Sequence, residues 1–169
     1  MGDGEPEELE SRAPEGKDLA FLCRELNERN AQYVIVGGFA IIAAGYARTT
    51  VDIDILIGNS VENEARVFDA LAKLPDGCVR ELQPGDVGAY MVVRVADEIV
   101  VDLMASASGI GYDEASKDIV WRELAGVQIP FASPALLWRM KRVTGRDKDA
   151  GDLSFLRQWF ASQGQAPPP

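Results

Sequence analysis

The sequence contains no histidine and only two cysteines, Cys23 and Cys78, among its 169 residues. The absence of histidine excludes a histidine-based catalytic triad, a histidine general base and a histidine-ligated metal site. Two isolated cysteines are more typical of core thiols in a reducing cytoplasm than of a disulfide. Any catalysis or metal binding must therefore use other groups.

The sequence also lacks a long apolar run, since no stretch approaches the ~20 apolar residues of a membrane span. Its first eighteen residues, MGDGEPEELESRAPEGKD, are acidic and contain no apolar signal-peptide core. These two absences predict a cytoplasmic protein without membrane contact.

Positive charge is scarce as well. Lysine and arginine total 17 against 27 acidic residues, which gives a formal net charge of −10. Such a chain is a poor general binder of nucleic acid, because contacts to phosphates need lysine and arginine. Part of the acidic excess lies in the first fifteen residues, so the local charge around a site matters more than the total.

Length and composition favour one globular domain, because 47% of the residues are apolar and the length suits a single core. We expect a disordered acidic tail over 1–15, a single domain over 16–162 and a disordered tail over 163–169.

Helices are predicted over 18–29, 60–74, 133–143 and 147–160, the second capped by Asn59. Strands are predicted over 33–36, 52–57, 90–95, 99–104, 119–124 and 127–131. The sequence does not decide the structure of residues 79–88, where the alternatives are a short strand that starts at Cys78 and a loop.

The stretch from Tyr33 to Ile57 organises the rest of the chain. Tyr33–Val36 is an unbroken apolar run, typical of a strand buried on both faces. Gly37-Gly38 then allows a sharp turn into a helix that begins over 39–44. The free N–H groups of that helix point back at the glycines and favour a phosphate there.

The second strand of this stretch carries two carboxylates. Side chains alternate along a strand, so Asp52 and Asp54 share one face about 7 Å apart at the backbone. Together they can bind one hard cation, and Mg²⁺ is usually held by one or two carboxylates plus substrate phosphates. The alternatives are a solvent-facing edge strand for the aspartates and a dinucleotide-binding turn for the glycines, although the third spaced glycine of that turn is missing.

The pattern Gly37-Gly38, an intervening segment 39–51, then Asp52-Ile53-Asp54 resembles the nucleotidyltransferase superfamily with the DNA polymerase β-like fold. The form RTTVDIDILI, which begins at Arg48, resembles the small bacterial AbiEii-type branch. This resemblance implies an α+β fold, with a mixed β-sheet flanked by helices and with C-terminal helices.

Asp102 interrupts the apolar run IVVDLM, where an unpaired carboxylate is costly. It needs a metal, a cation, or a strand-end position open to water. The resemblance implies a third acid on the strand beside the Asp-x-Asp strand, sharing the metal or accepting the proton of the attacking hydroxyl. It thus implies that Asp52, Asp54 and Asp102 are both the catalytic and the metal-binding residues.

Basic residues complete the expected site. Arg48 is either a surface arginine or a contact to triphosphate or to an aspartate. The segment from Lys141 to Lys148-Asp149-Ala150-Gly151-Asp152 resembles the AbiEii-type ending, which implies that Lys141 and Lys148 reach the triphosphate while Asp149 and Asp152 fix the lysines. The alternative is surface ion pairing, for example between Lys148 and Asp152, which are four residues apart. The expected nucleotide-binding residues are Gly37, Gly38, Arg48, Lys141 and Lys148.

The resemblance implies Mg²⁺-dependent transfer of a nucleoside monophosphate from a nucleoside triphosphate, such as ATP, to a hydroxyl acceptor, with one or two Mg²⁺ ions. The acceptor stays open between tRNA, as in AbiEii-type toxins that act with a cognate antitoxin protein, an aminoglycoside-like small molecule and a protein hydroxyl. A non-enzymatic alternative is a nucleotide-binding regulatory protein that acts with a partner chain.

Overall fold

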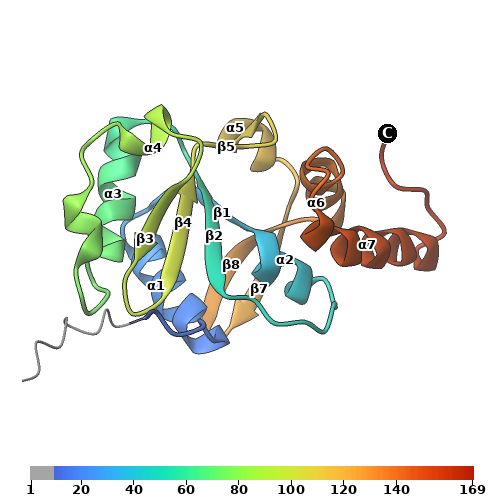
Figure 1. Ribbon diagram of the computed structural model, residues 1–169, viewed down its shortest axis with the longest axis horizontal. Coiled ribbons are helices and arrows are strands. Elements are labelled where there is room, and N and C mark those ends of the chain that lie inside the picture. Colours follow the sequence, from blue (N-terminus) through green and yellow to red (C-terminus); the bar gives the residue numbers. More distant parts are fainter. Residues whose placement is uncertain (1–9) are drawn as a thin grey trace, which may run out of the picture.

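A mixed sheet of six strands runs through the molecule in the order β3-β4-β2-β1-β8-β7 (Figure 1). The structure is a computed structural model that describes residues 10–169, so residues 1–9 of the expected acidic tail lie outside the described residues. Strand β2 runs parallel to β4 and β1 runs parallel to β8, whereas the other neighbours are antiparallel. The strands of this sheet are β1 (Tyr33–Val36), β2 (Asp52–Ile57), β3 (Val93–Ala96), β4 (Val100–Met104), β7 (Ile119–Leu124) and β8 (Val127–Ala132).

Helices pack on both sides of this sheet, as the expected α+β class requires. Helix α1 contacts α3 and β8, while α2 contacts β1 and β2 and lies beside α6, which packs against α7. A small second sheet pairs β5 (Ser106–Ala107) with β6 (Ile110–Gly111). The helices are α1 (Gly16–Glu28), α2 (Gly37–Ala43), α3 (Val61–Leu71), α4 (Asp86–Ala89), α5 (Tyr112–Ala115), α6 (Pro134–Lys141) and α7 (Ala150–Ser162), with 3₁₀ turns η1 (Cys78–Glu81) and η2 (Asp147–Asp149).

The core follows the apolar patterns of the sequence. All four residues of β1 are buried, and on β2 the side chains of Ile53, Ile55 and Ile57 are almost completely inaccessible. Helix α1 contributes a buried stripe that contains both Leu22 and the free thiol Cys23. Cys78 is also a free thiol but is only partly buried, so both cysteines are unpaired as expected, while only Cys23 is a core thiol.

The segment 79–88 after α3, whose structure the sequence left undecided, forms the 3₁₀ turn η1 and the short helix α4 rather than a strand. The buried carboxylate of Asp97, in the β3–β4 turn, accepts the backbone N–H groups of Asp76 (3.0 Å) and Cys78 (3.1 Å). These N–H groups are therefore unavailable to a strand ladder. Strand β3 also begins at Val93 rather than at Tyr90, which leaves the apolar side chains of 90–92 exposed.

The described parts of the two expected tails contact the domain. The Ser11 hydroxyl donates to the carbonyl oxygen of Asp97 (2.6 Å), and the Arg12 N–H donates to the carbonyl oxygen of Glu98 (2.9 Å). Near the C-terminus, the indole N–H of Trp138 donates to the carbonyl oxygen of Pro168 (2.9 Å). Disorder of the tails stays a prediction. No helix among residues 10–169 is long and apolar enough to cross a membrane.

A buried asparagine connects α3 to the two central strands. The Asn63 amide oxygen accepts the N–H of Gln32 (2.6 Å), and its amide nitrogen donates to the carbonyl oxygens of Gln32 and Gly58 (both 3.0 Å). The helix is capped by Ser60, whose hydroxyl accepts the Asn63 N–H, and not by the expected Asn59. Asn63 thus fixes where β1 begins and where β2 ends.

We expect Asn63→Ala to lower the free energy of unfolding by about 2 kcal/mol or more, because buried backbone groups lose their partners. Urea unfolding measures this change. The matched control is Asn59→Ala, an exposed position expected to change stability by less than about 0.5 kcal/mol. Equal effects of the two substitutions would contradict the role of Asn63.

Candidate active site

Three carboxylates meet on one face of the sheet because of the parallel pairing between β2 and β4. In this register Asp54 lies opposite Asp102, and Asp52 lies two residues earlier on the same face of β2. One oxygen from each of Asp52, Asp54 and Asp102 lies within 4.8 Å of the others. Asp102 is only 6% exposed and lies inside β4, so the alternative of a strand-end carboxylate facing water is wrong.

The electrostatics of this acidic triad favour a bound cation. Burial raises the pKa of Asp54 to about 7, and the charges of Asp52 and Asp102 act in the same direction. Burial and the neighbouring Asp102 also raise the pKa of Asp52. Three converging carboxylate oxygens are the hard donors that Mg²⁺ prefers, so the residues present fit such an ion.

The two glycines before α2 make room for the site. Gly37 has a φ of +66°, and a Cβ at this position would overlap the carboxylate of Asp54. A Cβ at Gly38 would lie 2.5 Å from the hydroxyl oxygen of Thr50. The Gly-Gly pair is therefore required by the close approach of Asp54 on β2 and of Thr50 just before β2 to the start of α2, and its role in phosphate binding stays a prediction.

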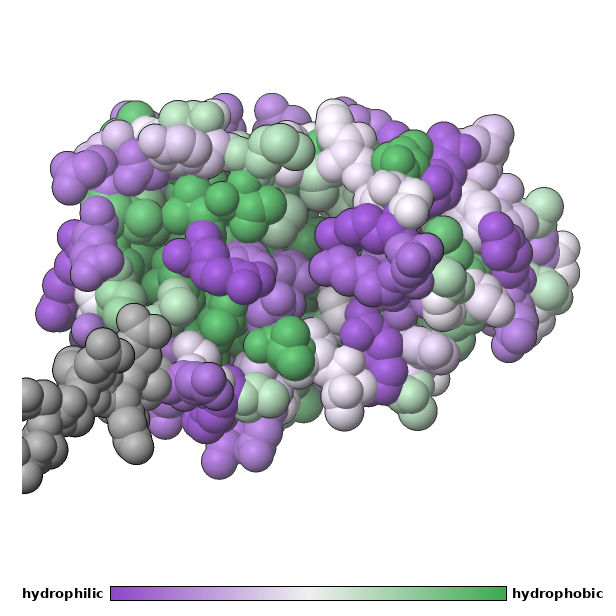
Figure 2. All heavy atoms as spheres, in the orientation of Figure 1, coloured by the Kyte–Doolittle hydropathy of each residue, from purple (hydrophilic) through white to green (hydrophobic). Residues whose placement is uncertain are grey.

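All eight predicted site residues line one cavity of about 770 Å³. Figure 2 shows hydrophobic side chains gathered over the α4–β3–β4 side of this face and hydrophilic side chains over the start of α7, with a hollow between them. The apolar side of the cavity includes the exposed residues Val51, Met91 and Val92. The predicted residues in its lining are Gly37, Gly38, Arg48, Asp52, Asp54, Asp102, Lys141 and Lys148.

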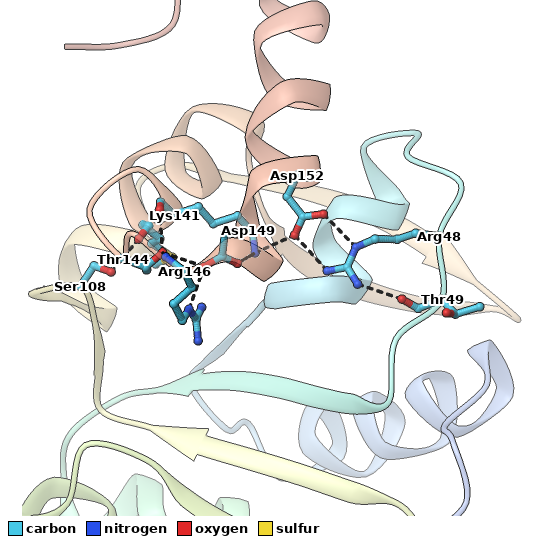
Figure 3. Close-up of polar contacts among 9 residues, drawn as sticks. Arg48, Thr49, Ser108, Lys141, Thr144, Arg146, Asp149 and Asp152 are labelled. Atoms are coloured by element: carbon cyan, nitrogen blue, oxygen red, sulfur yellow. Dashed lines mark hydrogen bonds and ion pairs between the residues drawn. The ribbon is translucent and has the colours of Figure 1, made fainter.

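A buried ion-pair network forms the opposite wall (Figure 3). The Lys141 ammonium lies 2.9 Å from an oxygen of Asp152 and 3.2 Å from an oxygen of Asp149, and all three residues are buried. Arg48 joins this network, with Nε 2.9 Å from Asp152 Oδ1 and Nη2 donating to Oδ2 at 3.0 Å. The expectation that the two acids fix a lysine holds for Lys141, and Arg48 contacts an acid rather than lying free on the surface.

Lys148 differs from Lys141. It is exposed and makes no ion pair with any residue of the described range 10–169. The alternative of an ion pair between Lys148 and Asp152 is wrong, because Lys141 and Arg48 already occupy the Asp152 carboxylate. Of the two lysines, Lys148 is the one whose ammonium is available to a ligand in the cavity.

Asp149 is the most heavily bonded acid of the network. The Thr144 hydroxyl (2.7 Å) and the Arg146 Nε (2.8 Å) both donate to its Oδ2. Burial raises the pKa of Asp149, but these hydrogen bonds and the charge of Lys141 outweigh burial and hold the pKa below its ordinary value. Gly151, unusual inside a helix, is explained by Tyr46, whose hydroxyl would lie 3.1 Å from a Cβ there.

Sequence reasoning missed Arg94, which lies on β3 directly opposite Asp102. Its Nε donates to Asp102 Oδ1 (2.9 Å) and its Nη2 to Asp102 Oδ2 (3.0 Å), while Nη2 also lies 3.4 Å from Asp52 Oδ2. The available signal was a single arginine between two buried valines on the strand next to Asp102. Thr144 was also missed, and Arg146 was not recognised as a partner of Asp149, although both lie within five residues of it in the chain.

Three solved structures, each 16% identical to this chain, share its fold. The antibiotic-resistance factor ANT(2'')-Ia has a TM-score of 0.52 at 16% identity, over 88% of this chain and 84% of that one. The protein TM1012 of Thermotoga maritima has a TM-score of 0.51 at 16% identity, over 86% of this chain and 92% of that one. An antigenic nucleotidyltransferase-like protein from Paracoccidioides brasiliensis has a TM-score of 0.52 at 16% identity, over 90% of this chain and 78% of that one. The comparison with curated proteins gave no match.

The fold and the acidic triad agree with the class of protein that a family model defines, the nucleotidyltransferases. A family model matches residues 17–155, which is most of the chain. The chain belongs to this family, described as nucleotidyltransferase of unknown function (DUF6036).

The raised pKa of Asp54 predicts how stability changes with pH in the absence of metal. Because this pKa is about 7 in the folded protein and near 4 in an unfolded chain, the folded state binds the extra proton between these values. Stability therefore falls as the pH rises from about 4 to about 7. Asp54→Asn should remove this contribution and melt at least about 3 °C above the unsubstituted protein at pH 8 in EDTA.

Melting temperatures between pH 5 and pH 8 in EDTA measure this effect. The exposed Asp69→Asn on α3 is the control and should follow the unsubstituted protein throughout. If Asp54→Asn shows the same pH dependence as Asp69→Asn, the carboxyl of Asp54 is not the group responsible.

The two cavity lysines should differ in their effect on stability. Lys141→Met leaves Asp149 and Asp152 without their shared cation, which should cost about 3 kcal/mol of unfolding free energy. Lys148→Met should cost less than about 0.5 kcal/mol, because its side chain is exposed and unpaired within residues 10–169. Urea unfolding of both variants tests this difference, and a small cost for both would show that the network contributes little in solution.

Proposed function

We propose that the protein transfers a nucleoside monophosphate from a nucleoside triphosphate to a hydroxyl acceptor, with one or two Mg²⁺ ions. The observation that carries this proposal is the convergence of Asp52, Asp54 and Asp102 in a cavity whose other wall is cationic. Membership of a nucleotidyltransferase family supports it. The proposal includes the expectation of a cytoplasmic location.

Asp52, Asp54 and Asp102 would hold the Mg²⁺, which when bound supplies positive charge against the phosphates and lowers the pKa of the acceptor hydroxyl. The Gly37-Gly38 turn and Lys148 would hold the triphosphate, while Lys141 and Arg48 shape the wall beside it. The chain thus acts mainly by positioning groups and by offsetting charge.

The acceptor oxygen would attack the α-phosphorus. A new bond forms between that oxygen and phosphorus, the bond from the α-phosphorus to the bridging oxygen breaks, and pyrophosphate leaves with those electrons. The hydroxyl proton goes to a carboxylate, for which Asp102 is the proposed base.

tRNA is the first acceptor to test, because the sequence resembles AbiEii-type toxins, which include tRNA-modifying enzymes. Such toxins act with a cognate antitoxin protein, which would then be a partner of this chain. The structure limits the cations that could contact RNA around α6, because Arg139 pairs with Glu114 and Lys141 is buried. Arg142, Arg146 and Lys148 remain exposed there. An aminoglycoside is the second acceptor to test, since a protein with this fold is an antibiotic-resistance factor.

The experiment is a label-transfer assay with purified protein, Mg²⁺ and each α-labelled nucleoside triphosphate. The acceptors are total tRNA, an aminoglycoside panel and a cell extract as a source of protein hydroxyls. We expect label in one acceptor class, and a loss of at least about 100-fold in Asp54→Asn, the scale on which removing one charge-stabilising group acts. Asp69→Asn on α3 is the control and should retain full transfer.

The outcomes separate the remaining alternatives. Transfer that persists in Asp54→Asn would contradict the assignment of the triad. Mg²⁺-dependent nucleotide binding without transfer to any acceptor would favour the non-enzymatic, regulatory alternative. Absence of both transfer and nucleotide binding would reject the proposed site.

A further inference from the structure

Arg94 is the one cation whose ion pairs, within residues 10–169, are with the acidic triad itself. The other paired cations of the cavity wall, Lys141, Arg48 and Arg146, bind Asp149 or Asp152 instead. The Arg94 guanidinium is paired with both oxygens of Asp102, and it also lies 3.4 Å from Asp52. Such a two-point contact is the strongest geometry available to an arginine and a carboxylate.

This contact and a divalent cation make competing demands on the same groups. A metal held by the triad needs oxygens of Asp52 and Asp102, and its double positive charge would lie beside the guanidinium. Like charges at such short range repel strongly where a cavity partly excludes water. Full engagement of Asp102 by Arg94 and binding of a metal ion therefore oppose each other.

Arg94 is also placed so that it can move. Its side chain is 60% exposed, in contrast to that of Lys141, which is 9% exposed and enclosed by two acids. The neighbouring residues Val93 and Val95 are buried and fix the backbone of β3. The guanidinium can therefore rotate away from Asp102 into the cavity without displacing the strand.

We propose that Arg94 is an exchangeable counter-ion of the acidic triad, which holds Asp102 and Asp52 when no metal is bound and releases them when a divalent cation enters. The released guanidinium lines the cavity, where it can bind the phosphates of the nucleotide in a two-point contact. Arg94 thereby prevents the carboxylates from remaining uncompensated and couples metal entry to the exposure of a phosphate-binding group. This proposal rests on the metal site of the proposed function.

The test measures Mn²⁺ binding without nucleotide, by electron paramagnetic resonance of the free ion. Arg94→Gln removes the competing charge and should bind Mn²⁺ more tightly, by about 5- to 150-fold, the range typical of coupling between two binding events. Arg94→Lys keeps the charge but cannot make the two-point contact, and should fall between Arg94→Gln and the unsubstituted protein. Arg122→Gln, an exposed arginine on strand β7, is the control and should leave the affinity unchanged.

A second readout observes Arg94 directly in the unsubstituted protein. The side-chain N–H of Arg94, identified by the nuclear magnetic resonance signal that Arg94→Gln loses, should exchange slowly with water in EDTA because it donates to Asp102. Saturating Mg²⁺ should accelerate that exchange. Retained protection at saturating Mg²⁺ would overturn the proposal.

The outcomes distinguish this proposal from the proposed function. Equal or weaker Mn²⁺ binding by Arg94→Gln, next to clear binding by the unsubstituted protein, would reject the exchange and leave the metal site in place. Absence of Mn²⁺ binding in the unsubstituted protein and in all variants would reject the metal site, and the exchange with it.

Discussion

The structure of the site depends on the parallel pairing of β2 with β4 in the register that places Asp54 opposite Asp102. This register concentrates negative charge where burial already disfavours it, as the raised pKa of Asp54 shows. The residues around the triad accommodate this buried negative charge. Gly37 leaves the space that the Asp54 carboxylate occupies, and Arg94 supplies a cation from the next strand.

Acidic residues around the cavity fall into two groups with different physical roles. Asp149 and Asp152 are buried with cations from their own part of the fold, so their charges are already compensated and they stabilise the wall. The triad carries more negative charge than the one arginine paired with it can offset. A cavity that combines a compensated wall with an under-compensated triad is suited to attract a metal ion together with an anionic substrate.

Local patterns were sufficient to predict β1, β2 and the Asp52/Asp54 pair, because alternation and apolar runs report directly on burial. The mixed sheet and the place of Asp102 on the neighbouring strand were implied by the resemblance to the nucleotidyltransferase superfamily. They could not predict Arg94, whose partner depends on the hairpin register. The expected turn over 96–98 would pair Arg94 with Val100, whereas the observed turn pairs it with Asp102. The pairing of Lys141 with Asp149 and Asp152 was implied by the family resemblance, because it depends on how α6 and α7 pack and side-chain spacing along one helix does not reveal it.

The contact between Arg48 and Asp152 joins residues that lie 104 positions apart in the chain. During synthesis the N-terminal residues emerge first, so the loop that carries Arg48 leaves the ribosome long before its acidic partner exists. Strand β1 must also wait for β8, with which it pairs in parallel. The cavity is therefore completed only after β8 and the start of α7 have been made, later than its three carboxylates.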